Sequence, residues 1–189
     1  MLSPLQRLGL VVGIFLIGMA VRVSPGADAK AQAEPPGAPV PPPPPELKVL
    51  QRFVGSWDTA GVSQVAEWTP REINTTGRVT MEWALGGRFV QGKGTDTLPS
   101  ELTMLWGYDA DRRAYRTWLF NSLGLAIEWT GDWDDRAQTF VVRNDVGNGL
   151  TGTLTTRFVG DDRIEWRSQV KDGDGKLYHS WEGTWTRRK

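Results

Sequence analysis

The sequence predicts an all-β fold, an up-and-down antiparallel β-barrel of about ten strands with a short N-terminal helix. Apolar and polar residues alternate with a two-residue period through much of the second half of the chain, which is typical of strands with one buried face. The segments between them are short and rich in Gly, Asp and Asn, which favour tight turns. No helical pattern interrupts the series, so a parallel sheet with crossover helices is not expected. Closure into a barrel removes exposed edge strands.

The helix is expected at Glu46–Val54, where apolar residues gather near one face and Gly55 follows as a natural stop. The ten predicted strands are 64–68, 76–85, 88–95, 102–108, 114–121, 125–133, 139–143, 150–158, 163–170 and 178–187.

The glycine pair Gly86-Gly87 separates two strongly alternating segments and predicts a two-residue primed hairpin turn. Both glycines are expected to be structural, because such a turn needs positive φ angles. Arg88 follows out of phase with Phe89. Its guanidinium is expected to bind carbonyl groups or a carboxylate at the barrel rim, or else an anionic group of a ligand at the barrel mouth.

The N-terminal part predicts export. Arg7 precedes the apolar run Leu8–Val21, which is shorter than the ~20 residues that span a bilayer, and Ala27-Asp28-Ala29 fits a cleavage site. Residues 1–29 are therefore expected to be a signal peptide, with an uncleaved signal anchor as the alternative. The eight prolines within 30–45 predict a stiff linker. The β-barrel domain is expected at 46–189, in a periplasmic or secreted protein that leaves the membrane after cleavage.

The composition excludes several classes of function. Basic and acidic residues both number 22, and the segment from Glu46 onward holds 19 and 20 of them, so no electrostatic footprint for nucleic acid is present. The absence of cysteine excludes disulfides, thiolate metal sites and cysteine nucleophiles. His179 is the one histidine, which excludes a site built from several histidines. The sequence predicts no metal and no resident cofactor.

The ten tryptophans all follow residue 56, and many share the apolar phase of their strands. Such a content of flat, apolar rings is typical of a wide core or of a cavity lined by aromatic side chains. Glu82, Glu128, Glu165 and Glu182 fall in the opposite, polar phase and are expected on a solvated outer face. The residues predicted to bind a ligand inside the barrel are Trp83, Arg88, Trp106, Trp129, Trp166, His179 and Trp181.

These features favour a non-enzymatic binding module whose partner is a small apolar or aromatic ligand held in the barrel. One alternative is chemistry at His179, which falls in the inward phase and could ligate haem iron or act as a general acid or base. The other alternative is a structural domain whose interior is filled by tryptophans.

Several short motifs resemble the DUF1579 family of exported bacterial proteins of unknown function. The opening motif is Leu-x-x-Phe-Val-Gly-x-Trp at 50–57, and Leu-Gly-Gly-Arg-Phe follows at 85–89. The others are Gly-Tyr-Asp at 107–109, Tyr-x-x-Trp at 115–118 and Gly-x-Trp-Asp at 131–134. The Gly-x-Trp opening is also similar to lipocalins and related calycin barrels, which implies a barrel closed at one end. The resemblance covers most of 47–187 and brings no established activity or catalytic residues.

Overall fold

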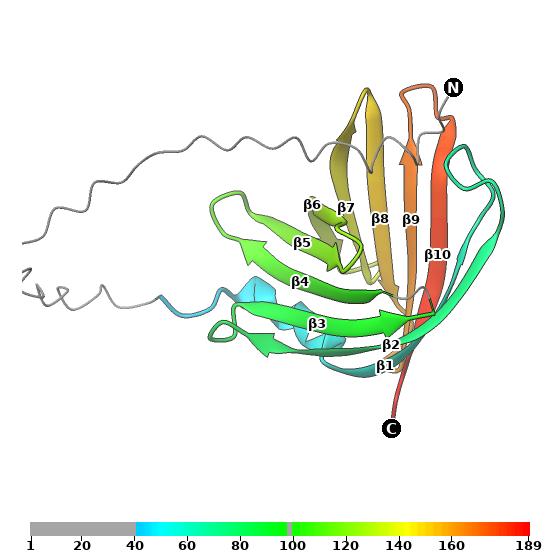
Figure 1. The fold of residues 1–189 in the computed structure, drawn as a ribbon. Coiled ribbons are helices and arrows are strands. Elements are labelled where there is room, and N and C mark those ends of the chain that lie inside the picture. The colour runs from blue at the N-terminus through cyan, green and yellow to red at the C-terminus, as the bar shows by residue number, and fades with distance from the viewer. Residues whose placement is uncertain (1–40, 98–99) are drawn as a thin grey trace, which may run out of the picture. The chain divides into compact units, whose positions relative to one another are not determined.

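One short helix and ten strands account for most of the chain after residue 44 (Figure 1). The structure, a computed structural model, describes residues 41–97 and 100–189. The predicted signal peptide 1–29 and most of the predicted linker 30–45 lie outside the described residues. Among the described residues, no helix is long and apolar enough to cross a membrane.

The strands form a closed antiparallel barrel in which each pairs with its neighbours in sequence and β1 pairs with β10, which confirms the predicted fold class. They are β1 (Gly55–Ser63), β2 (Ile73–Ala84), β3 (Phe89–Asp96), β4 (Glu101–Asp109), β5 (Ala114–Asn121), β6 (Ala126–Asp134), β7 (Thr139–Gly147), β8 (Leu150–Phe158), β9 (Arg163–Lys171) and β10 (Leu177–Arg187).

The predicted strand at 64–68 is wrong, because those residues belong to the connection between β1 and β2. The first strand is instead Gly55–Ser63. Its glycine, alanine, serine and aspartate residues are poor strand formers, so local propensity gives little sign of it. Pairing on both sides, with β2 and with β10, holds these residues in the sheet. The total of ten strands is unchanged.

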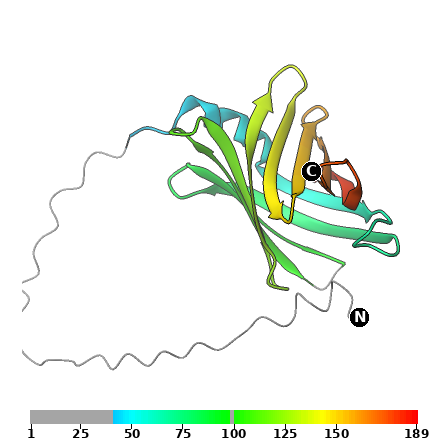
Figure 2. The same ribbon diagram turned by 90° about the horizontal axis from the view of Figure 1, so that it is seen from above.

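The helix predicted at Glu46–Val54 is the 3₁₀-helix η1 (Pro45–Phe53), which lies against β3 and β4 at the left-hand end of the barrel in Figure 1. Its buried residues Leu47, Leu50 and Phe53 are three apart, and the three-residue turn of a 3₁₀-helix places such residues on one face. The Phe53 ring stacks on Trp106 at 4.7 Å between centroids. Figure 2 shows η1 beside this end from above. The helix therefore closes one end of the barrel.

Arg187 fastens the end of η1 to the barrel. Its guanidinium donates to the carbonyl oxygens of Val54 (2.7 Å) and Arg52 (3.0 Å), and its Cζ lies 4.1 Å from the centroid of the Trp57 ring. The Trp57 indole N–H in turn donates to the carbonyl of Phe53 at 2.7 Å. These bonds satisfy carbonyl groups that the helix terminus leaves free.

The turn between β2 and β3 has four residues rather than the predicted two. Ala84 pairs with Phe89, and the Ala84 carbonyl accepts from the N–H groups of Gly87 (3.1 Å) and Arg88 (3.2 Å). Leu85, Gly86 and Gly87 adopt φ angles of 50°, 67° and 75°. The chain thus reverses through three successive left-handed residues, and the glycines are needed for their φ angles.

Replacement of Gly87 by valine should lower the free energy of unfolding by roughly 1–2 kcal/mol, because a β-branched residue resists positive φ. Open space surrounds both Gly87 and Gly173, but only Gly87 has a positive φ. The matched control is therefore Gly173→Val, which should cost much less. Chemical denaturation of the two variants measures the difference, and equal losses would contradict the role assigned to Gly87.

The inward and outward faces follow the predicted alternation, since the register of β6, β9 and β10 places their tryptophans on the inner face. The predicted outer glutamates carry ion pairs across neighbouring strands: Glu128 with Arg116, Glu165 with Arg157 at 2.5 Å, and Glu182 with Arg167 at 2.7 Å. Glu82 is exposed. These exposed pairs contribute little to stability but confirm the outer face.

Candidate functional site in the open half of the barrel

The interior has two halves with different packing. Around η1, inward-facing side chains such as Trp57, Val90, Phe140 and Ile164 are fully buried in one aromatic and aliphatic cluster. Toward the opposite end, many inward-facing residues keep part of their solvent exposure, so solvent reaches the inner face there. We call this region the open half. Its half-buried inward residues include Thr59, Gly61, Ile73, Asp96, Leu102, Leu119, Ile127, Asn144, Leu154, Trp166, Ser168, His179 and Trp181.

Trp166 of β9 and Trp181 of β10 form an aromatic pair in the open half. Their ring centroids are 5.3 Å apart at an interplanar angle of 84°. The two rings lie over glycines: a Cβ at Gly61 would sit 3.0 Å from Trp181 Nε1, and a Cβ at Gly183 would sit 2.7 Å from Trp166 Cζ2. The glycines of β1 and β10 therefore provide the space that the two indoles occupy.

Both indole N–H groups of this pair are buried and have no hydrogen-bond partner among the described residues, and neither does the amide oxygen of Asn144. A buried polar group without a partner costs about 1–3 kcal/mol, and folded proteins satisfy nearly all such groups. In the helix half the pattern differs, because Trp57 donates to a backbone carbonyl and Trp83 donates to Gln51 Oε1 at 2.7 Å. The open half thus contains two buried indole N–H donors, those of Trp166 and Trp181, without a hydrogen-bond partner among the described residues.

His179 lies two residues before Trp181 on the same face of β10. Its Nδ1 lies 3.3 Å from the hydroxyl oxygen of the buried Thr69. Burial lowers the pKa of His179 below its ordinary value, so the ring is neutral at pH 7. A histidine that acts as a general base is normally oriented by a hydrogen bond to a carboxylate or a carbonyl. The side-chain partner of His179 is instead the Thr69 hydroxyl.

The burial of His179 predicts a loss of stability on acidification. Because the pKa is lower in the folded chain than the ordinary 6.5, the unfolded chain binds more protons in the interval between the two values. The penalty is therefore absent well above pH 6.5, grows as the pH falls below 6.5, and reaches its full size once the pH is below the lowered pKa of the folded state. Thermal melts at about pH 7.5 and about pH 5 should show a smaller drop in Tm for His179→Gln than for the parent. Equal drops would rule out this linkage.

The structure separates the seven residues predicted to bind a ligand. Trp166, His179 and Trp181 come together in the open half. Three of the predicted residues lie at the helix end instead. Trp106 is buried against Phe53, Trp83 lies beside η1, and Arg88 belongs to the β2–β3 turn. Trp129 is buried in β6, in register with Thr117 of β5.

Sequence reasoning missed three features of this region: the glycines that receive the indole rings, the hydroxyl of Thr75 beside Gly61, and Asn144. Asn144 shares the phase of Phe140 and Val142. An extension of the predicted strand 139–143 by one residue would have revealed it.

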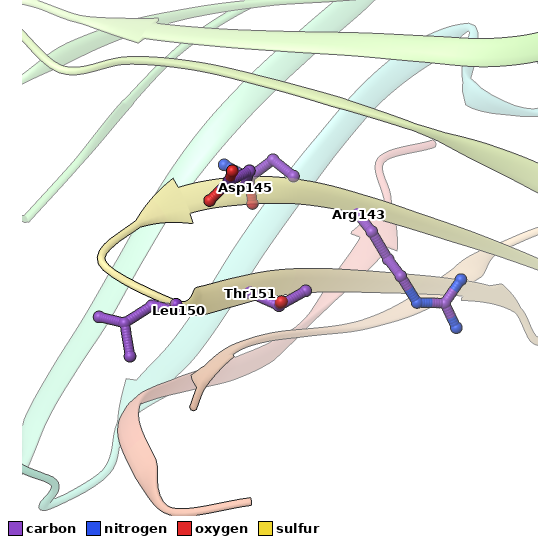
Figure 3. A pocket seen from close by; sticks show the side chains of 6 residues that line it. Arg143, Asp145, Leu150 and Thr151 are labelled. Carbon is purple, nitrogen blue, oxygen red and sulfur yellow. The ribbon is translucent and has the colours of Figure 1, made fainter. Parts of the chain in front are cut away.

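Two hollows lie at the surface. One of about 480 Å³ lies at the β7–β8 hairpin, where Arg143 and Asp145 come from one strand and Leu150 and Thr151 from the next (Figure 3). The other, of about 370 Å³, lies over the outer side chains of β2, β3 and β4. The second hollow is lined mainly by residues in the outward phase, whereas the first shares Asn144 with the open half. In the described part of the chain, no group of three or more acidic or histidine residues is placed to hold a metal ion.

The fold and the interior place this protein among antiparallel β-barrels: ten strands close the barrel, a helix covers one end, and aromatic side chains fill much of the inside. The chain belongs to the DUF1579 family, described as a protein family of unknown function, whose model matches residues 42–187. No curated protein matches the sequence.

Among solved structures, Rv2717c from M. tuberculosis has a TM-score of 0.58 and 13% identity, over 78% of this chain and 100% of that one. The S-type phycobiliprotein lyase CPES from Guillardia theta has a TM-score of 0.49 and 15% identity, over 74% and 90% of the two chains. At these identities, the likeness to Rv2717c supports a shared fold and nothing more.

Proposed function

We propose that the protein is a non-enzymatic binding module that takes a small, mainly apolar ligand into the open half of the barrel. The observation that carries this proposal is the contrast between the two halves. The helix half is closed by η1, whereas the open half presents half-buried apolar and aromatic side chains to solvent. Concave, largely apolar surfaces with a few polar groups are the usual form of small-molecule sites.

The expected affinity is moderate. A flat ligand the size of an aromatic side chain buries about 150–250 Å². At ~25 cal/mol per Å² of apolar surface, this burial contributes about 4–6 kcal/mol. That range corresponds to a Kd from roughly tens of micromolar to a millimolar.

The cellular location belongs to the same proposal. Residues 1–29 have the features of a cleavable signal peptide, and the proline-rich linker would hold the barrel away from a membrane or partner. We therefore propose that the protein acts in the periplasm or outside the cell. Mass spectrometry of the mature protein should give an N-terminus near Lys30. Recovery of an intact Met1 from the membrane fraction would contradict export with cleavage.

Titration of the full-length protein with N-phenyl-1-naphthylamine, a neutral apolar dye, tests ligand binding. Dye fluorescence should rise and saturate. Leu154→Trp places a larger ring on the inner face of the open half and should weaken binding at least tenfold, because the ring takes up ligand space. Thr155→Trp, on the outer face of the same strand, is the matched control and should bind as the parent does. Absence of saturable binding, or equal weakening in both variants, would refute the proposed site.

A further inference from the structure

We propose that the ligand of the open half is a neutral, flat molecule that carries a carbonyl-type hydrogen-bond acceptor, and that Trp166 and Trp181 are the residues that recognise this acceptor. The inference rests on the proposed function and specifies the chemical class of ligand.

The first argument concerns charge. Among the described residues of the open half, no inward-facing side chain is a lysine or an arginine. His179 is neutral at pH 7, and the inward acidic residue Asp96 accepts a hydrogen bond from the Ser100 hydroxyl at 3.5 Å. An anionic ligand would lose its hydration here without gaining a cation, and an uncompensated buried charge is strongly unfavourable. The open half therefore favours an uncharged ligand.

The second argument concerns hydrogen bonding. An indole N–H is a donor only, so it needs an acceptor. The N–H groups of Trp166 and Trp181 have none among the described residues, and both are shielded from solvent. Their rings remain half-buried, so they lie at the boundary where an entering ligand makes contact. A ligand oxygen bonded to either group would remove the penalty of an unpaired buried donor.

The third argument concerns shape. The two rings meet edge to face, which leaves one ring face and one ring edge as contact surfaces for a planar partner. The backbone of Gly61 and Gly183 lies directly against these rings, near Trp181 Nε1 and Trp166 Cζ2, because those positions carry no side chain. A planar aromatic ligand matches these contact surfaces best.

The test uses three naphthalenes that compete with N-phenyl-1-naphthylamine on the full-length protein. 2-Acetylnaphthalene carries the acceptor, 2-isopropenylnaphthalene replaces its C=O by C=CH₂, and 2-naphthoate carries a negative charge. The parent should bind 2-naphthoate at least tenfold more weakly than the ketone. Its preference for the ketone over the alkene should fall by about tenfold in Trp166→Phe/Trp181→Phe, which keeps aromatic rings but removes both donors. Trp83→Phe, which removes a donor in the helix half, is the control and should keep the parent's preference.

The outcomes separate the two proposals. If the dye binds but the ketone preference is the same in the parent and the double variant, the recognition by Trp166 and Trp181 is wrong while the binding site stands. If 2-naphthoate binds as tightly as the ketone, the requirement for a neutral ligand is wrong. This comparison uses the parent protein and does not depend on the folding of a variant. If the dye itself does not bind, the proposed function fails, and the inference fails with it.

Discussion

Phe53→Ala should lower the free energy of unfolding by about 3–5 kcal/mol, the range for removal of a fully buried aromatic side chain. The Phe53 ring is 0% exposed and sits at the centre of the cluster that closes the barrel. It stacks on Trp106 at 4.7 Å and meets Phe158 edge to face at 4.9 Å. Alanine would leave a cavity among large rigid rings that cannot collapse to fill it. Urea denaturation at constant m-value measures the loss.

The matched control is Lys48→Ala on the same helix, where the side chain is exposed. It should change stability by no more than about 0.5 kcal/mol, as is usual for surface positions. A loss below about 1 kcal/mol for Phe53→Ala would mean that η1 is not docked in the barrel end.

Gly183→Val should be comparably damaging, at about 3 kcal/mol or more, because it forces a side chain into filled space. A Cβ at this position would clash with the Ala60 carbonyl oxygen of β1 and would lie 2.7 Å from Trp166 Cζ2. Neither the neighbouring strand nor the packed indole can give way cheaply. We expect the variant to melt at a much lower temperature and to change the environment of Trp166.

The neighbouring residue Thr184 points to the outer face of the same strand, so Thr184→Val is the control for the introduction of valine into β10. Thermal melts followed by tryptophan fluorescence compare the two. A Gly183→Val protein that melts like Thr184→Val would show that the indole pair does not pack against this glycine.

Much of the barrel was predictable because alternation is the direct sequence signature of a sheet with one buried face. The predicted second to tenth strands therefore fall on β2 to β10, and the inward positions of Trp166 and Trp181 follow from phase alone. β1 was not predictable, since its small and polar residues lack β-propensity and its strand form depends on pairing with β10, far away in sequence.

The division of the interior into two halves could not be predicted from the sequence either. Trp106 and Trp166 share the same apolar phase in their strands, yet the docking of η1 buries Trp106 and leaves Trp166 half-buried. No local sequence pattern predicts at which end of the barrel the helix will pack. Whether an indole N–H finds a hydrogen-bond partner also depends on the three-dimensional structure, because the partner can come from any strand of the barrel.

The most direct test of the proposed site is a two-dimensional ¹H–¹⁵N spectrum of the tryptophan indole N–H groups, recorded while 2-acetylnaphthalene is added to the full-length protein. Each of the ten tryptophans contributes one indole N–H resonance, which reports on the surroundings of that side chain. We expect the resonances of Trp166 and Trp181 to shift progressively, while that of Trp57, bonded to the Phe53 carbonyl, stays in place. A spectrum in which Trp166 and Trp181 do not move, or in which Trp57 moves most, would contradict ligand binding in the open half.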